Sequence, residues 1–195
     1  MFGNPLSNEM HWPVKKMKTV ASAKPYPGEI PSINGKYWLL NLDAVESQTG
    51  EIIERVFVPL DELSSSITTF SPDNVLYSKL RPYLNKVVIP DHYGYATTEM
   101  VPLFPDKKCL HPVFLSYFLK GDIFVSFITK HSSGTKMPRV NMDEFWNVDL
   151  ILPPLELQEE FSYLVQQSDK SKFELKKTIE SLEALYKSII AEYLG

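Results

Sequence analysis

Short β-favouring runs recur through the first 105 residues and are separated by turn formers. Runs of this length that are rich in branched and aromatic side chains are typical of strands. They lie at residues 37–42, 52–58, 74–79, 86–89 and 97–104. The pattern therefore predicts a β-sheet in this part of the chain.

Two apolar segments with helical spacing follow these runs. Residues 113–119 and 123–129 place aromatic and aliphatic side chains at spacings of three and four, which predicts two buried helices that break at Gly121. The polar stretch 131–141 predicts a loop, and residues 148–152 predict a closing strand.

The chain changes character at Pro153 and Pro154. All 15 prolines lie in the first 154 residues, and helix-forming residues dominate beyond them. The apolar positions then alternate at spacings of three and four, as in a coiled-coil seam, at Leu175, Ile179, Leu182, Tyr186, Ile189 and Tyr193. An unbroken helix over residues 155–193 would be about 58 Å long at roughly 1.5 Å per residue. This length favours a partner helix over a helix folded back on its own domain.

The composition is that of a globular protein in a reducing compartment. Hydrophobic residues make up 44% of the chain and charged residues 23%, which excludes collagen-like and wholly disordered chains. The single cysteine, Cys109, leaves no internal disulfide and no thiolate cage for a metal ion. The N-terminal residues lack the pattern of a signal peptide, and no apolar run reaches the length of about 20 residues that crosses a bilayer. We therefore expect a cytoplasmic protein that does not span a membrane.

Charge is unevenly distributed along the chain. The net charge is −4, so bulk electrostatics alone does not indicate binding to nucleic acid. Residues 40–78 carry one cation and seven acids, whereas residues 79–139 carry nine cations and four acids. This polarity predicts a basic face, with a solvated surface on which the charges average out as an equal alternative.

The residue types needed for catalysis do not converge in the sequence. No glycine-rich phosphate loop is present, and the four histidines lie far apart without metal-ligand spacing. Cys109 lies near Lys107 and Lys108, but no third group that would orient it as a nucleophile can be identified. We expect no catalytic residue, no bound metal and no cofactor, and therefore a binding protein.

Two polar segments are suited to recognition of double-stranded DNA. Cations can neutralise phosphates, while Arg and Asn can pair bidentately with guanine and adenine edges. The candidate residues of both segments are Lys79, Arg81, Tyr83, Asn85, Lys86, Lys130, Ser133, Gly134, Thr135, Lys136 and Arg139. The first segment could instead be a hairpin that packs on the sheet, and the second a plain connection in which Asn141 caps a short helix.

Four stretches, taken in this order, resemble the specificity subunits of type I restriction-modification systems. They are NVLYSKLRPYLNKVVI (74–89), ATTEMVPLFP (96–105), SGT with RVN (133–141) and ILPPLELQ (151–158). The resemblance implies a target recognition domain that reads one half of a bipartite DNA site, and a long helix that pairs with a second such helix. It also implies that methyltransferase and restriction subunits bind the chain and carry out the catalysis. The family usually has Glu where this chain has Leu157.

Together these patterns predict an α+β protein. A mixed β-rich target recognition domain at residues 1–152 precedes one long coiled-coil-forming helix at residues 153–195. Family subunits usually have two such domains and two helices, and residues 1–5 and 192–195 resemble the two sides of the junction between the halves. The chain therefore resembles one half of a tandem subunit, either a natural half-subunit or a piece of a longer one.

We expect the seam to form an antiparallel homodimer, with a different half-subunit as the alternative partner. Two alternative functions remain open. The chain could be the recognition subunit of a related type II-like restriction-methylation enzyme, or a coiled-coil scaffold without DNA binding.

Overall fold

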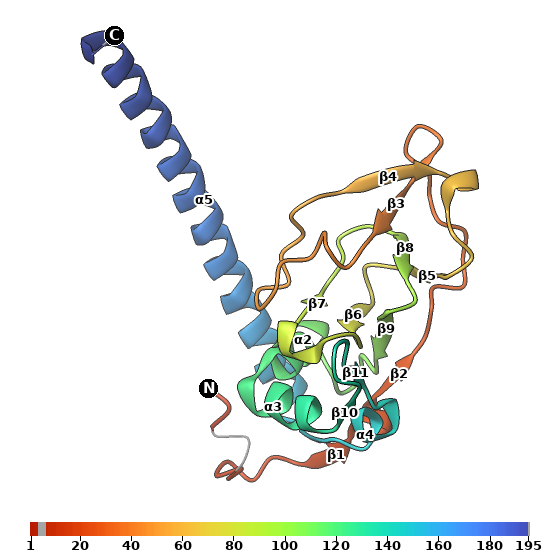
Figure 1. Cartoon of the computed structure of the whole chain (residues 1–195). Helices are drawn as coiled ribbons and strands as arrows, with labels where there is room; N and C mark the ends of the chain where they lie inside the picture. Colours follow the sequence, from red (N-terminus) through yellow and green to blue (C-terminus); the bar gives the residue numbers. More distant parts are fainter. Residues whose placement is uncertain (4–6, 195) are drawn as a thin grey trace. The chain divides into compact units, whose positions relative to one another are not determined.

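The chain folds into two compact units, Met1–Gln158 and Glu159–Gly195. The computed structural model describes residues 1–3 and 7–194, and the side chains of these ranges up to residue 191. The first unit is rich in strands, and the second is the larger part of one long helix (Figure 1). This arrangement confirms the predicted α+β class. The predicted junction residues 1–5 and 192–195 lie partly outside the described residues.

Two four-stranded sheets form the frame of the first unit (Figure 1). The first sheet has the order β2-β9-β6-β7 and is antiparallel throughout. The second has the order β4-β3-β8-β5, in which β3 and β8 run parallel and the other neighbours antiparallel. The strands of the first sheet are β2 (Ala21–Ala23), β9 (Met100–Pro105), β6 (Val75–Ser78) and β7 (Val87–Val88). Those of the second are β4 (Val56–Pro59), β3 (Lys36–Leu40), β8 (Gly94–Thr97) and β5 (Ile67–Phe70).

Two short antiparallel pairs and several helices complete the fold. The pairs are β1 (Val14–Lys16) with β12 (Asp149–Ile151), and β10 (Ser132–Ser133) with β11 (Arg139–Val140). The helices are α1 (Met17–Val20), α2 (Pro112–Lys120), α3 (Asp122–Lys130), α4 (Met142–Trp146) and α5 (Leu155–Leu194), with the 3₁₀ turns η1 (Leu60–Glu62) and η2 (Pro82–Leu84).

All four residues of strand β6 are buried. Since successive side chains of a strand point to opposite sides, the strand is buried on both of its faces. Leu76 joins a core cluster with members from both sheets, which are Trp38, Leu40, Ala44, Val45, Phe70, Leu76, Val88, Ala96 and Met100. Tyr77 instead packs against Phe124 of α3 and Phe145 of α4, with ring centroids 6.0 and 4.9 Å away. Burial raises the pKa of the Tyr77 hydroxyl well above its usual range. Through this strand, the sheets and the helices α3 and α4 therefore pack into one core.

Helices α2 and α3 confirm the predicted pair with its break at Gly121. His111 caps α2, since its Nδ1 accepts a hydrogen bond from the Val113 backbone N–H at 3.2 Å. No single helix among the described residues is long and apolar enough to cross a membrane. Helices α2 and α3 meet that criterion only as a pair, with a bend of 61° between them.

Several strands differ from the sequence prediction. The predicted run 97–104 is divided between β8 and β9, because the chain turns at Thr98 and Glu99. The run 52–58 becomes a strand only from Val56 onward. Strands β1, β2 and β5 were not predicted, since each has only three or four residues and pairs with a distant segment.

The side chain of Gln158 joins the first turn of α5 to the β-rich unit. It is fully buried, and its Oε1 accepts a hydrogen bond from the His111 backbone N–H at 2.9 Å. Its Nε2 donates to the carbonyl oxygens of Cys109 at 3.0 Å and Pro153 at 2.8 Å. The first compact unit accordingly extends through the first turn of α5 to Gln158. The predicted division into a domain at residues 1–152 and a helix at residues 153–195 stays a prediction.

The apolar seam of α5 is exposed in the single chain. The helix has 40 residues and agrees with the predicted length. Leu175, Ile179, Leu182, Tyr186 and Ile189 are each between 46% and 66% exposed. The side chain of Tyr193, the last predicted seam residue, lies outside the described part of the structure. Exposed apolar residues at coiled-coil spacing are typical of a helix that pairs with another helix.

The buried Gln158 amide gives a first test. Gln158→Leu keeps the size of the side chain but leaves one backbone N–H and two carbonyl oxygens without this partner. We expect the free energy of unfolding to fall by about 2–4 kcal/mol in urea denaturation followed by tryptophan fluorescence. Gln166→Leu, at an exposed position of α5, is the matched control and should change it by less than about 0.5 kcal/mol. Equal losses for the two variants would contradict this role of Gln158.

Candidate nucleic-acid interface

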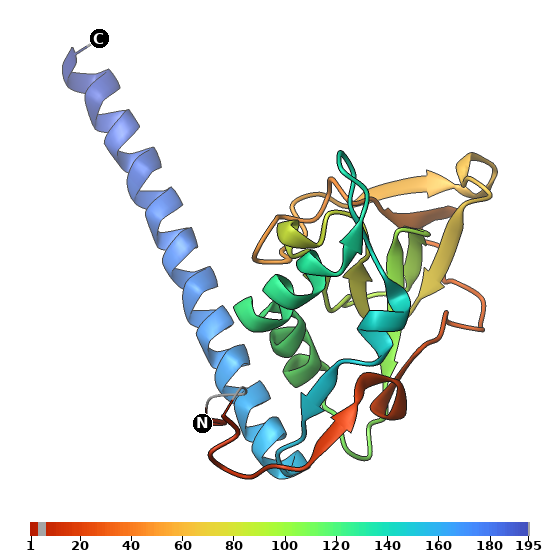
Figure 2. The same ribbon diagram turned by 60° about the horizontal axis from the view of Figure 1, so that its bottom comes forward.

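The two recognition segments predicted from the sequence lie side by side. The Arg81 backbone N–H donates to the Pro138 carbonyl at 2.7 Å, and the Val140 N–H donates to the Lys79 carbonyl at 2.8 Å. The β10–β11 hairpin, drawn in teal, projects from the rest of the domain in Figure 2. The backbone thus holds the cations of both segments in one region.

The first segment turns sharply through η2. Arg81 and Asn85, which flank this turn, both have left-handed backbone conformations, with φ of 50° and 52°. Asn tolerates this region, but for Arg it is unusual and persists where surrounding contacts fix the backbone. The hydrogen bond from Arg81 to Pro138 is such a contact. At the turn, Tyr83 is exposed.

Two of the predicted DNA-contacting side chains are engaged inside the domain. Asn85 is buried, and its Nδ2 donates to the Lys120 carbonyl at 3.0 Å. Lys86 is half-buried, and its Nζ donates to the Leu42 carbonyl at 2.6 Å. In these positions both side chains hold the turn against other parts of the domain.

The second segment is a short hairpin with an exposed tip. Gly134 has a φ of +100°, which strains any residue with a Cβ atom, and a Cβ there would lie 3.2 Å from the Met137 carbonyl oxygen. Ser133, Thr135 and Lys136 are exposed beside it. The tip therefore presents hydroxyls, a backbone without a side chain and a cation to solvent.

Residues 131–141 also include the predicted helix cap. The Asn141 side chain accepts hydrogen bonds from the backbone N–H groups of Asp143 at 3.0 Å and Glu144 at 3.5 Å, and so caps α4. The segment is therefore both an exposed hairpin and the start of a capped helix.

Glu99 is the residue of this region that sequence reasoning missed. Strands β6 and β9 pair Ser78 with Met100, which places Glu99 next to Lys79, whose N–H donates to the Glu99 carbonyl at 3.0 Å. The Glu99 carboxylate pairs with the guanidinium of Arg139, with 2.8 Å between Oε1 and Nη2. Only the strand register brings these residues together, so their spacing in the sequence gives no signal.

Three lysines of the region have no acidic partner among the described residues. Lys130 and Lys136 are exposed and Lys79 is half-buried, and none of them forms an ion pair within the part of the chain that the structure describes. Unpaired cations beside exposed hydroxyls and backbone N–H groups are the donors that bind phosphate oxygens.

A comparison with protein-family models finds one family that matches this chain. The model of the type I restriction modification DNA specificity domain matches residues 69–184, which is more than half of the chain. The chain belongs to this family. The matched range contains both recognition segments, Glu99 and the first part of the α5 seam.

Curated specificity subunits are similar to this specificity domain. The type I restriction enzyme EcoDI specificity subunit of Escherichia coli is 26% identical over 152 residues, which are 76% of this chain and 34% of that protein. The MjaVIII specificity subunit of Methanocaldococcus jannaschii is 30% identical over 97 residues, which are 50% of this chain and 22% of that protein. The chain thus spans about a third or less of these relatives.

Solved structures of the family share the fold. The HsdS subunit from Thermoanaerobacter tengcongensis has a TM-score of 0.65 and 20% identity, over 85% of this chain and 44% of that one. A chain from a study of complex assembly and conformational transition of the type I R-M system has a TM-score of 0.66, with the same identity and coverage. At this level of identity the likeness shows the fold alone.

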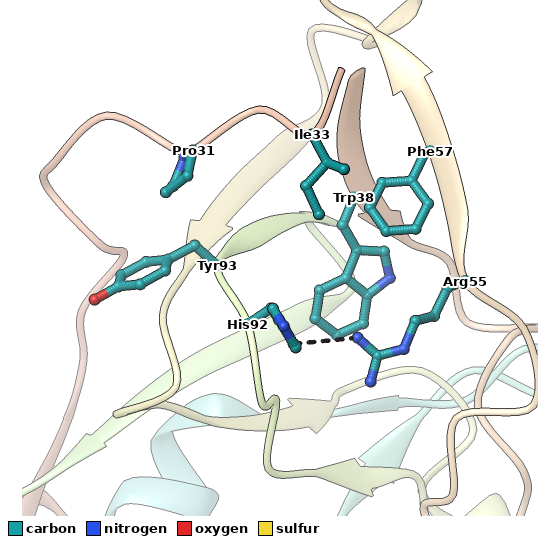
Figure 3. A pocket seen from close by; sticks show the side chains of 7 residues that line it. All are labelled: Pro31, Ile33, Trp38, Arg55, Phe57, His92 and Tyr93. Atoms are coloured by element: carbon teal, nitrogen blue, oxygen red, sulfur yellow. Dashed lines mark hydrogen bonds between the residues drawn. The ribbon is translucent and has the colours of Figure 1, made fainter. Parts of the chain in front are cut away.

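The β-rich unit also contains a separate aromatic pocket, of which only two lining residues, His92 and Tyr93, lie within the matched range. It is lined by Pro31, Ile33, Trp38, Arg55, Phe57, His92 and Tyr93 (Figure 3). The Arg55 guanidinium lies over the Trp38 indole, 4.8 Å from the ring centroid. The buried Trp38 Nε1 has no hydrogen-bond partner among the described residues.

Two residues that line this pocket, Arg55 and His92, belong to an ion-pair cluster. Arg55 pairs with the carboxylate of Asp91, whose second oxygen lies 3.0 Å from the His92 Nδ1. Partial burial by itself raises the pKa of Asp91. The hydrogen bonds from Arg55 and His92 and the charge of Arg55 outweigh this effect and lower the pKa of Asp91 to about 2. The cluster therefore fixes the guanidinium on the indole.

The structure also describes the sites weighed for catalysis. Partial burial and the nearby charge of Asp106 raise the pKa of the Cys109 thiol, which disfavours the thiolate needed for a nucleophile. Within the described residues, no three His, Cys, Asp or Glu side chains converge as a metal site would require.

The Asp91 cluster predicts a pH dependence of stability. Because folding lowers the pKa of Asp91, its contribution is present above the unfolded pKa of about 4 and is lost as the pH falls toward 2. Asp91→Asn should lower the free energy of unfolding by less than about 1 kcal/mol at pH 7, since the carboxylate is more than half exposed, and by progressively less toward pH 2.

Urea denaturation at a series of pH values measures this difference. Asp61→Asn, at an exposed aspartate without an ion pair among the described residues, is the control and should give no such trend. A destabilisation by Asp91→Asn that is the same at pH 7 and pH 2 would contradict the prediction.

Proposed function

We propose that this chain is a DNA-recognition subunit of a type I restriction-modification system that binds one half of a bipartite target. The observation that carries the proposal is the joining of two cationic segments into one surface within the family-matched range. We define this interface surface by Lys79, Arg81, Tyr83, Lys130, Ser133, Gly134, Thr135, Lys136 and Arg139. Asn85 and Lys86 are left out, because their side chains are engaged within the domain.

The electrostatics of the surface favour DNA although the whole chain is acidic. The net charge is −4, so attraction to phosphates depends on where the cations lie rather than on their number. Lys130 and Lys136 have no intramolecular ion pair among the described residues, so little interaction is lost when they bind phosphates. Each cation that neutralises a phosphate releases a counterion, which makes affinity depend on salt.

Lys136→Ala tests the surface directly. In titrations of a fluorescent duplex at several salt concentrations, the variant should bind more weakly and lose about one unit of slope in the log–log plot, because one phosphate contact is lost. Lys107→Ala is the matched control. Lys107 pairs with Asp73, which precedes β6, whereas Lys79 of the interface surface follows it. The control therefore removes a cation at the opposite end of this strand from the interface surface. The control should leave the slope unchanged, and an unchanged slope in Lys136→Ala as well would remove Lys136 from the interface.

We further propose that the seam of α5 pairs with the same seam of a second chain in an antiparallel homodimer. Exposed Leu, Ile and Tyr side chains at coiled-coil spacing are stabilised when they are removed from water, and a contact between identical faces closes with two copies. Such a dimer would recognise an inverted repeat whose spacing is set by the helices. A different half-subunit would give an asymmetric site instead.

The double variant Leu182→Asp/Ile189→Asp tests the pairing. It should convert a dimer to a monomer in light scattering, because two charges would be buried in the seam. Ser181→Asp/Ser188→Asp is the control, with the same charge change and the same seven-residue spacing on a neighbouring face of the helix. The control should remain dimeric. A monomeric unmodified chain at high micromolar concentration would refute self-pairing.

In this proposal, cleavage and methyl transfer belong to the methyltransferase and restriction subunits that the chain directs. The chain itself would be non-catalytic and would need no cofactor. We expect it to act in the cytoplasm.

A further inference from the structure

The ion pair between Glu99 and Arg139 differs in kind from the other charges of the interface surface. Besides the contact from Nη2 to Oε1 at 2.8 Å, the Nε of Arg139 donates to Oε2 of Glu99 at 3.4 Å. The carboxylate therefore holds one edge of the guanidinium. The Glu99 side chain is 23% exposed and that of Arg139 is 58% exposed, so the acid is the sheltered partner and the guanidinium faces solvent.

The backbones that carry both residues are fixed by the sheet. Lys79 lies between them, since its N–H donates to the Glu99 carbonyl at 3.0 Å and its carbonyl accepts from the Val140 N–H at 2.8 Å. Arg139 and Leu80 form an additional β-bridge. A side chain on a fixed backbone and held by a carboxylate loses little conformational freedom when it binds a ligand.

The free edge of Arg139 has the donor geometry that recognises guanine. With Nε and one N–H of Nη2 directed to Glu99, the two N–H groups of Nη1 and the second N–H of Nη2 remain available. Two parallel N–H donors from one guanidinium match the O6 and N7 acceptors of guanine in the major groove. A phosphate contact needs no such orientation, and the neighbouring carboxylate would weaken it by repulsion.

We propose that Arg139 reads a guanine base of the target and that Glu99 is its positioning residue. This inference rests on the proposed DNA-recognition function. Because the pair is electrically neutral, it contributes specificity and little of the salt-dependent attraction, which comes from Lys130 and Lys136. The surface thus separates base reading from phosphate binding.

A selection from a randomised duplex pool tests the role of Arg139. The full chain is incubated with the pool, and the bound DNA is sequenced. The unmodified chain should prefer guanine at a particular position, and Arg139→Lys should reduce that preference about ten-fold or more, because Lys cannot pair bidentately. Preferences at other positions should remain.

The double variant Arg139→Ala/Glu99→Ala tests the division of roles, because it keeps the net charge unchanged. It should also lose the guanine preference while its affinity for random duplex and its salt slope stay close to those of the unmodified chain. Glu99→Gln should reduce the preference and strengthen binding to random duplex, since the surface gains one positive charge. A purely structural ion pair would not move these two quantities in opposite directions.

The outcomes separate this inference from the function on which it rests. Absence of any salt-dependent duplex binding by the full chain would overturn both. Binding with a guanine preference that survives in Arg139→Lys and in the double variant would overturn the inference alone. A loss of about one unit of salt slope in the double variant would make Arg139 a phosphate contact and would likewise overturn it. Melting temperatures measured by circular dichroism identify any variant that is not folded. If either Arg139→Lys or the double variant is unfolded, the guanine preference of the folded one tests the inference.

Discussion

The burial of strand β6 on both faces is the constraint on which the interface surface depends. Leu76 packs in the core that the two sheets share, and Tyr77 packs against aromatic rings of α3 and α4. Neither face can slip without moving large side chains out of close-packed surroundings. The residues that follow the strand, beginning with Lys79, therefore leave the core at a fixed place, where the backbone of the β10–β11 hairpin meets them.

This constraint explains how an acidic chain can present a local basic surface. The pairing of β6 with β9 on one side, and of residues 79–81 with 138–140 on the other, places cations from distant parts of the sequence together. The same register places the acid Glu99 among them, where it pairs with Arg139. Of the surface charges, Arg139 is thus paired with a carboxylate, while Lys130 and Lys136 form no ion pair among the described residues.

Long periodic elements were predictable from the sequence, whereas the joining of the segments was not. Helices α2, α3 and α5 agree with their patterns, since each carries enough repeated apolar positions to define a face. Strands such as β2 are too short to give a periodic signal and are stabilised by distant partners. Both candidate segments were selected by their residue types, and their role in recognition stays a prediction. The inward orientation of Asn85 and the presence of Glu99 follow only from the tertiary register.

The exposed seam of α5 and the small number of unpaired lysines on the interface surface both favour the joining of two chains. A surface with a few unpaired lysines supplies limited phosphate neutralisation and gives weak binding at physiological salt on its own. Under the proposed pairing, a second chain would bring a second surface, and binding of one half-site would raise the effective concentration of the other by the geometry of the helices. Burial of the seam would then contribute to recognition as well as to assembly, because affinity for the full site depends on two half-sites held at one spacing.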